Sequence, residues 1–279
     1  MMVSDQDYQL FLFALKNSSK YDFSQYSEKS LKRRILKILT DHSMTITSLV
    51  TRIKIDAEFV EEVVKEITVN TTELFRDPQV WQTIRFTILP RFKNNQVINI
   101  WHAGCSTGQE VYSMLILLNE MGMLDKARVY ATDINTDVMD LAKLGEYRYR
   151  FNLAYLDNFD KVVKENPFNY EEYNDVPYDK YLVLDKTNDT IKMNNFLREK
   201  PVFKKHDLVM ENNTLYVKFD LILCRNVIIY FNYNLQCHVF DLFHQSLYDT
   251  GCLIMGMHET ILGVPASKFQ KKGHAYFKN

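Results

Sequence analysis

One stretch of the chain constrains the fold more than any other. Residues 97–101 are an apolar run typical of a buried strand, residues 103–108 form a loop of small side chains, and residues 110–118 follow a helical pattern. Gly104 and Gly108 flank this turn. Because glycine has no Cβ, such a turn lets a ligand lie against bare backbone beside the positive end of a helix. The loop lacks the glycine spacing of dinucleotide sites and the Gly-Lys-Ser/Thr of triphosphate sites, so it predicts a nucleoside-like ligand.

Beyond this turn, strands and helices alternate. We expect strands at residues 128–132, 219–224 and 252–257, and helices at residues 136–144 and 235–247. Such alternation predicts an α/β fold with a parallel sheet and helices on both faces. Ligands of such sheets bind at the carboxyl ends of the strands.

The residues before the alternation follow a helical pattern. Leu31, Ile35 and Ile38 recur at helical spacing among charged residues. We therefore expect an N-terminal all-α domain with its linker at residues 1–77 and a sheet domain at residues 78–279.

Residues 145–200 interrupt the alternation of the sheet domain. They are rich in Tyr, Asn and Asp, and a segment of about 55 residues is too long for a bare connection. We expect a small inserted β-subdomain here, with a helix near residues 156–164 and strand pieces at residues 181–184 and 190–193.

Composition excludes several classes of protein. The chain of 279 residues is 46% hydrophobic and 25% charged, with a net charge of −1, which does not indicate a nucleic-acid binder. Cys105, Cys224, Cys237 and Cys252 form no short-spaced pair, so neither a metal site nor a disulfide framework is expected. The N-terminal residues lack the pattern of a signal peptide, and no apolar run approaches the length of about 20 residues that spans a membrane. We therefore expect a cytoplasmic protein without membrane insertion.

Two acidic residues follow predicted strands. Asp133 ends the second strand, where the two oxygens of a carboxylate can accept hydrogen bonds from both ribose hydroxyls. The alternative is a cap for the helix that begins near Asn135. Asp207 follows a short apolar piece, and it is either an acceptor for an adenine amino group or an ordinary turn residue.

A third group of polar residues follows the predicted strand at residues 219–224. Arg225 and Asn226 follow the strand, and Tyr230 lies one turn further along. The alternative is a helix start with Asn226 as the cap. A buried arginine needs a partner, which favours a functional site.

A fourth candidate segment lies outside the sheet domain. Residues 70–76 read Asn-Thr-Thr-Glu-Leu-Phe-Arg and offer four polar side chains and a guanidinium group. Capping boxes look similar, and on this segment alone helix capping is the stronger interpretation.

Taken in chain order, these motifs resemble those of the CheR methyltransferases, bacterial enzymes that methylate receptor glutamates with S-adenosylmethionine (SAM). The matching pieces are residues 22–26, 30–35, 70–77, 101–113, 131–135, 145–147, 219–231 and 256–259. The resemblance implies a SAM-dependent methyltransferase sheet domain, S-adenosylhomocysteine (SAH) as the product and no metal. It also implies transfer to glutamate side chains of methyl-accepting chemotaxis receptors, which forms methyl esters.

The resemblance assigns roles to individual residues. It places Arg76 and Tyr230 close to the transferred methyl group. With the glycine turn, it gives the expected cofactor-binding set of Asn70, Thr72, Arg76, Gly104, Glu110, Asp133, Asp207, Leu208, Arg225 and Asn226.

The chain departs from the family pattern in three places. Gln109-Glu110-Val111 stands where the family often has Glu-Glu-Pro, and Gly104 replaces a commoner alanine or serine. The inserted subdomain, which docks a receptor tail peptide in some members, matches least.

The resemblance suggests a function for a cluster of basic residues. Lys32, Arg33, Arg34 and Lys37 lie on one predicted helix, and a solvated face is the plain interpretation of such a cluster. A positive face also steers an acidic receptor helix toward the protein. Two other functions stay open at this stage: a SAM-binding or SAH-binding signalling scaffold or sensor without turnover, and a methyltransferase for a different protein substrate.

Overall fold

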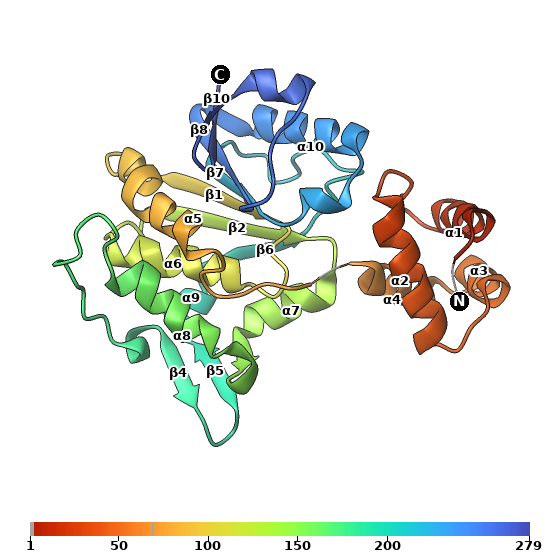
Figure 1. The fold of residues 1–279 in the computed structure, drawn as a ribbon, viewed down its shortest axis with the longest axis horizontal. Coiled ribbons are helices and arrows are strands. Elements are labelled where there is room, and N and C mark those ends of the chain that lie inside the picture. The colour runs from red at the N-terminus through yellow and green to blue at the C-terminus, as the bar shows by residue number, and fades with distance from the viewer. Residues whose placement is uncertain (1–2, 69) are drawn as a thin grey trace.

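The computed structural model describes residues 3–68 and 70–279, and it places a group of helices beside a larger sheet domain (Figure 1). The helices of this N-terminal domain are α1 (Asp5–Ser18), α2 (Glu28–Asp41), α3 (Ile46–Ile55) and α4 (Ala57–Ile67). Side chains of Ser4, Thr45 and Asp56 cap α1, α3 and α4. The four helices enclose their own apolar core.

The main sheet lies at the centre of the second domain, with the strand order β6-β2-β1-β7-β8-β10-β9. Its strands are β1 (Ile98–Ala103), β2 (Ala127–Asp133), β6 (Val202–Lys205), β7 (Phe219–Cys224), β8 (Leu247–Met255), β9 (Phe269–Lys272) and β10 (Ala275–Lys278). The strands from β6 to β8 pair in parallel, as the alternation predicted.

The sheet departs from the predicted parallel arrangement at one edge. β10 pairs antiparallel with both β8 and β9, so the sheet is mixed. A tight turn at Gly273, which has a φ of +61°, joins β9 to β10. Antiparallel neighbours need only such a short turn, and this hairpin follows the last strand predicted from the sequence.

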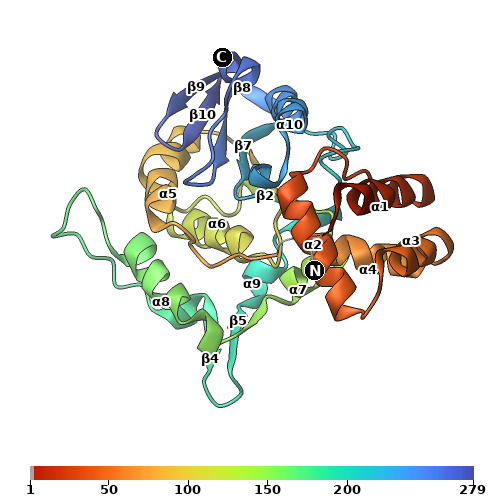
Figure 2. The same cartoon turned by 45° about the vertical axis from the view of Figure 1, so that its right-hand side comes forward.

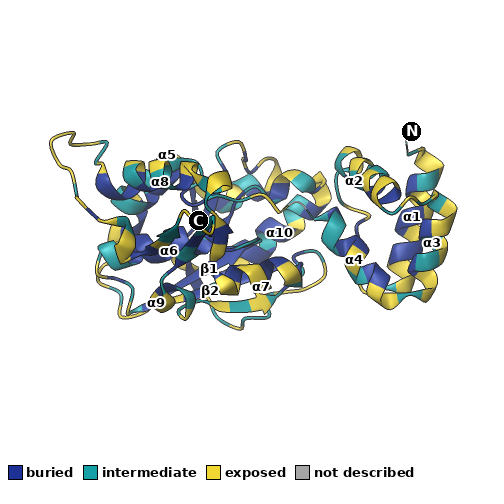
Figure 3. Ribbon diagram, turned by 90° about the horizontal axis from the view of Figure 1, so that it is seen from below, coloured by how far each residue is buried: buried dark blue, intermediate teal, exposed yellow. Residues whose placement is uncertain are grey.

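Helices cover both faces of the sheet, as predicted. The larger helices are α5 (Pro78–Thr83), which continues through a π turn at Ile84–Ile88 and a 3-10 turn at Leu89–Phe92, α6 (Gln109–Glu120), α7 (Thr136–Leu144) and α10 (Tyr233–Ser246). Successive side chains of β1 point to opposite faces. Ile100 packs in the core with α6, while Trp101 packs against α10. Figure 3 shows the buried residues gathered on the sheet and on the inner sides of the helices.

A small β-subdomain is inserted between α7 and β6. Its elements are β3 (Glu146–Arg148), α8 (Ala154–Phe159), a π turn at Asp160–Lys164, β4 (Leu182–Asp185), β5 (Thr190–Met193) and α9 (Asn195–Arg198). The strands pair antiparallel in the order β3-β5-β4. Phe159 and Tyr181 are buried in the same core as α6, so the insertion packs firmly against the sheet domain. The predicted fold class is therefore confirmed.

The helical domain contacts the sheet domain near the carboxyl ends of the strands (Figure 2). Lys65 of α4 forms an ion pair of 2.8 Å with Asp137 of α7. Lys205 of β6 donates a hydrogen bond of 2.6 Å to the hydroxyl of Tyr21. In the described residues, no helix combines the length and the apolar character that a membrane crossing requires.

Candidate active site

One pocket opens at the carboxyl ends of β1, β2 and β7, between the two domains. It encloses about 1090 Å³ of space outside the protein atoms, part of which is open solvent. Every site residue predicted from the sequence lines it: Asn70, Thr72, Arg76, Gly104, Glu110, Asp133, Asp207, Leu208, Arg225, Asn226 and Tyr230. The fold therefore brings segments that are far apart in the sequence into one cavity.

The glycines of the first turn serve two different purposes. Gly104 lines the pocket with a φ of +81°, and a Cβ there would lie 2.5 Å from the Cγ2 atom of Val227. Both the φ and the contact require glycine. At Gly108 a Cβ would lie 2.8 Å from the Cβ of Ala142 in α7, so this glycine allows helix packing and does not face the pocket. Of the two glycines only Gly104 lines the pocket, so ligand approach stays a prediction for Gly104.

Asp133 is buried at the end of β2 with 8% of its surface exposed. Its Oδ2 atom accepts a hydrogen bond of 2.9 Å from the backbone N–H of Ser106, and its Oδ1 atom accepts one of 3.0 Å from that of Asn135. Burial raises the pKa of Asp133, and these backbone N–H groups act in the opposite direction. The capping alternative was wrong, because the side chain of Asn135 itself caps α7. Each oxygen of Asp133 keeps acceptor capacity for a ribose hydroxyl.

Asp207 and Leu208 line the pocket just beyond β6, the strand next to β2, where the N–H of His206 donates to the carbonyl of Asp133 at 3.0 Å. The Oδ1 atom of Asp207 accepts a hydrogen bond of 2.8 Å from the backbone N–H of Val209, so the residue has the predicted turn role and also lines the pocket. Burial raises the pKa of Asp207. His206 was missed by the sequence reasoning. Its Nε2 atom contacts the carbonyl of Asn212 at 2.8 Å, and its buried Nδ1 atom has no hydrogen-bond partner within residues 3–68 and 70–279.

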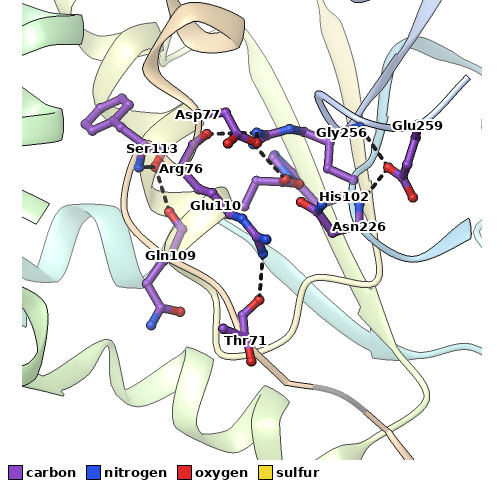
Figure 4. Close-up of polar contacts among 12 residues, drawn as sticks. Thr71, Arg76, Asp77, His102, Gln109, Glu110, Ser113, Asn226, Gly256 and Glu259 are labelled. Carbon is purple, nitrogen blue, oxygen red and sulfur yellow. Dashed lines mark hydrogen bonds and ion pairs between the residues drawn. The ribbon is translucent and has the colours of Figure 1, made fainter. Parts of the chain in front are cut away.

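Arg225 is buried and lies at the centre of a charge network, and Figure 4 labels its partners Arg76, Asp77 and Glu110. Its Nη2 atom donates to the Asp77 carboxylate at 2.9 Å and to the Arg76 carbonyl at 2.7 Å, and its Nη1 atom lies 3.3 Å from Glu110 Oε2. Glu110 Oε1 contacts the Nδ1 atom of His102 at 2.8 Å. Burial alone would raise the pKa of Glu110, but His102 and Arg225 lower it below its ordinary value. The network therefore holds Arg76 and Asp77, between the two domains, against the carboxyl end of β7.

Asn226 begins the loop that carries Tyr230, and Glu259 holds this loop in place. Asn226 has a φ of +60°, and its backbone N–H donates to Glu259 Oε2. Glu259 also accepts hydrogen bonds from the N–H groups of Gly256 at 2.8 Å and Ile229 at 3.3 Å. Burial raises the pKa of Glu259, and the backbone donors oppose that change.

The alternative of Asn226 as a helix cap was wrong. The next α-helix, α10, begins at Tyr233, and its cap is Asn232, whose side chain accepts from the N–H of Leu235. The loop after β7 contains instead a 3-10 turn at Ile228–Tyr230.

The capping interpretation of residues 70–76 was also wrong. α5 begins at Pro78, and no side chain caps it within the described part of the chain. The segment has no regular secondary structure and runs along the pocket. Within it, Arg76 Nη1 donates to the Thr71 carbonyl at 3.1 Å. The N–H of Phe75 donates to Ser113 Oγ at 2.7 Å, and this bond holds residues 70–76 against α6.

The helical domain forms the remaining wall of the pocket, which the sequence reasoning did not foresee. Tyr26, Ser30 and Arg34 line it, and the Nε atom of Arg34 is buried without a partner in the described structure. Ser30 and Arg34 are four positions apart on α2, a spacing that places them on one helix face and that could have revealed this wall.

The predicted basic face of α2 is weaker than its sequence indicates. Lys32 forms ion pairs with Asp5 and Glu28, and Lys37 pairs with Asp41. Arg33 is exposed, whereas Arg34 turns toward the pocket.

Comparison with known proteins identifies the family. The family model described as CheR methyltransferase, all-alpha domain, matches residues 6–68, and the one described as CheR methyltransferase, SAM binding domain, matches residues 70–277. The chain belongs to the CheR methyltransferase family. The Cher3 protein of Pseudomonas putida is 34% identical over 259 residues, which cover 92% of this chain and 90% of that protein. The chemotaxis protein methyltransferase of Listeria monocytogenes is 28% identical over 262 residues, 92% of this chain and 91% of that protein.

This CheR protein is therefore a SAM-dependent methyltransferase, as the motifs predicted. The pocket fits the cofactor. Adenosine presents hydroxyl and amino donors. The pocket offers a buried acceptor at Asp133, a partly buried one at Asp207 and a buried Ser106 hydroxyl that has no partner among the described residues. The methionine end of SAM carries a carboxylate, which the planar guanidinium of Arg76 is suited to bind.

Proposed function

We propose that this CheR protein transfers the methyl group of SAM to glutamate side-chain carboxylates in the cytoplasmic helical region of methyl-accepting chemotaxis receptors. The observation that carries the proposal is the presence of Arg76 and Tyr230 in the same pocket as the carboxylate at the end of β2. The names of relatives such as the Listeria monocytogenes chemotaxis protein methyltransferase support the receptor as the partner.

The acceptor needs little chemical activation. A glutamate side chain has an ordinary pKa of about 4.3, so it is ionised and nucleophilic at neutral pH without a general base. When bound, SAM supplies an electrophilic methyl group on a positively charged sulfur. The residues of the pocket therefore have three tasks: they align the acceptor, exclude water and place the charges.

Arg76 and Tyr230 are the groups we assign to alignment. Arg76 donates one hydrogen bond of 3.1 Å to the Thr71 carbonyl. Because a guanidinium has five N–H donors, others remain for a carboxylate. Tyr230 lines the same pocket from the loop after β7 and offers a hydroxyl as a hydrogen-bond donor. We assign cofactor binding to Arg76 as well, through the carboxylate of SAM, and to the other pocket residues predicted from the sequence.

The partner is proposed to approach across α2. Arg33 is exposed on this helix, and Arg34 reaches the pocket wall with its Nε atom free of any partner in the described residues. Lys32 and Lys37 contribute less to steering, because both are held in ion pairs with residues of the protein itself. An acidic receptor helix would therefore meet one exposed cation on the way to a second cation at the pocket.

Labelled methyl transfer tests the proposal. The protein is incubated with methyl-labelled SAM and membranes that contain a chemotaxis receptor, and the labelled receptor is then treated with mild base. A carboxyl ester releases its label as methanol, whereas N-methylation is stable to base. Base-stable label would contradict glutamate esterification, and SAH binding without any labelled protein would favour a scaffold or sensor.

A further inference from the structure

The helical domain is hydrogen-bonded to the backbone on both sides of Phe231, and one of these bonds is to the carbonyl of the proposed methyl-transfer residue Tyr230. The N–H of Ser27 donates to the carbonyl of Tyr230 at 2.8 Å, and the N–H of Asn232 donates to the carbonyl of Gln25 at 2.8 Å. Tyr26 and Phe231 form an antiparallel bridge between these two bonds. The bridge joins residues that are about two hundred positions apart in the chain.

Side chains reinforce this bridge. The rings of Tyr26 and Phe231 meet edge to face, with centroids 5.0 Å apart, and the ring of Phe23 packs on the other side of Tyr26 at 4.6 Å. Tyr26, Tyr230 and Phe231 all line the pocket. The bridge is therefore part of the pocket wall.

Both domains hold the loop that carries Tyr230. Near its start, Glu259 of the sheet domain accepts from the backbone N–H groups of Asn226 and Ile229. At its end, the bridge from the helical domain holds the backbone of Tyr230. The second support adds to the 3-10 turn at Ile228–Tyr230 and to Gln236 of α10, whose Nε2 atom donates to the carbonyls of Ile228 at 3.2 Å and Phe231 at 3.0 Å.

From this arrangement we infer that Ser27 is a positioning residue, whose backbone N–H fixes Tyr230 for methyl transfer. This inference rests on the proposed role of Tyr230. Ser27 is also the residue directly before α2, the helix that carries Ser30 and Arg34 to the pocket. The helical domain therefore contributes Ser30 and Arg34 to the pocket wall and also the hydrogen bond that holds Tyr230.

Replacing Ser27 by proline removes this single hydrogen bond, because proline has no backbone N–H. Ser27 has a φ of −57°, which suits proline, and its position at the start of a helix tolerates proline. The Ser27 side chain makes no capping hydrogen bond, so Ser27→Ala keeps the N–H and serves as the matched comparison.

The measurement is receptor methylation at saturating SAM, with SAH affinity determined by calorimetry. Relative to Ser27→Ala, we expect Ser27→Pro to lower kcat at least about tenfold, since small misplacement of an aligning group is costly. The Kd for SAH is expected to stay within about twofold, because the bond holds Tyr230 and not the cofactor. Equal kcat values would overturn the inference, and so would a parallel loss of SAH affinity.

A double-mutant cycle separates this inference from the proposed function. If Ser27 acts through Tyr230, the kcat penalty of Ser27→Pro disappears in a Tyr230→Phe background. An undiminished penalty there would show that Ser27 acts by another route and would overturn the inference. A wild-type rate for Tyr230→Phe alone would instead overturn the assigned role of Tyr230.

Hydrogen exchange keeps the inference testable if Ser27→Pro does not fold. In the unmodified protein, we expect the amides of Ser27 and Asn232 to exchange more slowly than the neighbouring exposed Gln25 amide. Equally fast exchange at all three positions would show that the bridge does not persist in solution and would overturn the inference.

Discussion

The carboxylate of Glu259 accepts a hydrogen bond of 2.7 Å from the backbone N–H of Asn226, and this contact fastens the loop after β7 to the segment after β8. The same carboxylate accepts from Gly256, where a Cβ would lie only 2.6 Å from Glu259 Oε2. Glycine at position 256 therefore leaves the space that the carboxylate occupies.

Removal of this carboxylate is expected to loosen the site. Glu259→Ala leaves backbone donors of Asn226, Ile229 and Gly256 without an acceptor, and unsatisfied buried donors cost about 1–3 kcal/mol each before relaxation. We expect the free energy of unfolding in urea to fall by about 2–4 kcal/mol and SAH affinity to weaken. Glu259→Gln keeps one acceptor oxygen and should lose less of both. Equal stability of all three proteins would show that the loop has another anchor.

Glu110 is expected to give a pH-dependent contribution to stability. Its pKa is lowered in the folded protein, where His102 and Arg225 outweigh the effect of burial. A carboxyl group with a lowered folded pKa stabilises the protein above its unfolded pKa of about 4.3, and this contribution is lost as the pH falls through the folded value.

The matched variant Glu110→Gln isolates this contribution. At pH 7 we expect it to lower the free energy of unfolding by about 2–4 kcal/mol, since it removes one partner of a buried charge. The difference from the wild type should shrink as the pH falls from the unfolded pKa of about 4.3 through the lowered folded pKa of Glu110, where the carboxylate becomes protonated in the folded protein as well. A difference that stays constant from pH 7 to pH 3 would contradict the charge network shown in Figure 4.

Arg76 and Tyr230 are expected to affect turnover more than folding. We expect Tyr230→Phe and Arg76→Ala each to lower kcat by about 10–100-fold at saturating SAM, because each aligns a reacting group. Melting temperature serves as the control for folding. Unchanged turnover in both variants would remove these residues from the catalytic role.

Charge on α2 is expected to act more on the receptor than on the cofactor. We expect Arg33→Glu, and more strongly Arg33→Glu combined with Arg34→Glu, to raise the KM for receptor by about 3–10-fold at low salt. The effect should fade as the salt concentration rises. Lys54→Glu on α3 is the matched control, since Lys54 is exposed and lies on another helix of the same domain. An equal effect of the control, or methylation independent of salt, would argue against steering by α2.

Local patterns were sufficient to predict much of the fold. The turn at Gly104, the carboxylate of Asp133 and the polar pair after β7 each adjoin a strand whose apolar run is plain in the sequence. Because the carboxyl ends of parallel strands share one sheet edge, these residues had to lie close together.

The partners of these residues come from distant parts of the chain and could not be predicted locally. Asp77 meets Arg225 across 148 positions, and Glu259 meets Asn226 across 33. Packing of two domains also places Tyr26 in the pocket wall. Hydrophobic periodicity does not encode such pairings, because it reports only which face of an element is buried.

Calorimetric titration of SAH into the wild-type protein and Asp133→Ala tests the site most directly. Asp133 is buried at the end of β2, and its acceptor oxygens are the pocket feature best suited to the ribose. We expect one SAH per chain to bind the wild type. We expect binding by Asp133→Ala to be at least about tenfold weaker, because this variant loses one charge-assisted pair of hydrogen bonds. Equal affinity in the two folded proteins, or no SAH uptake by the wild type, would contradict the assignment of this pocket to the methyl donor.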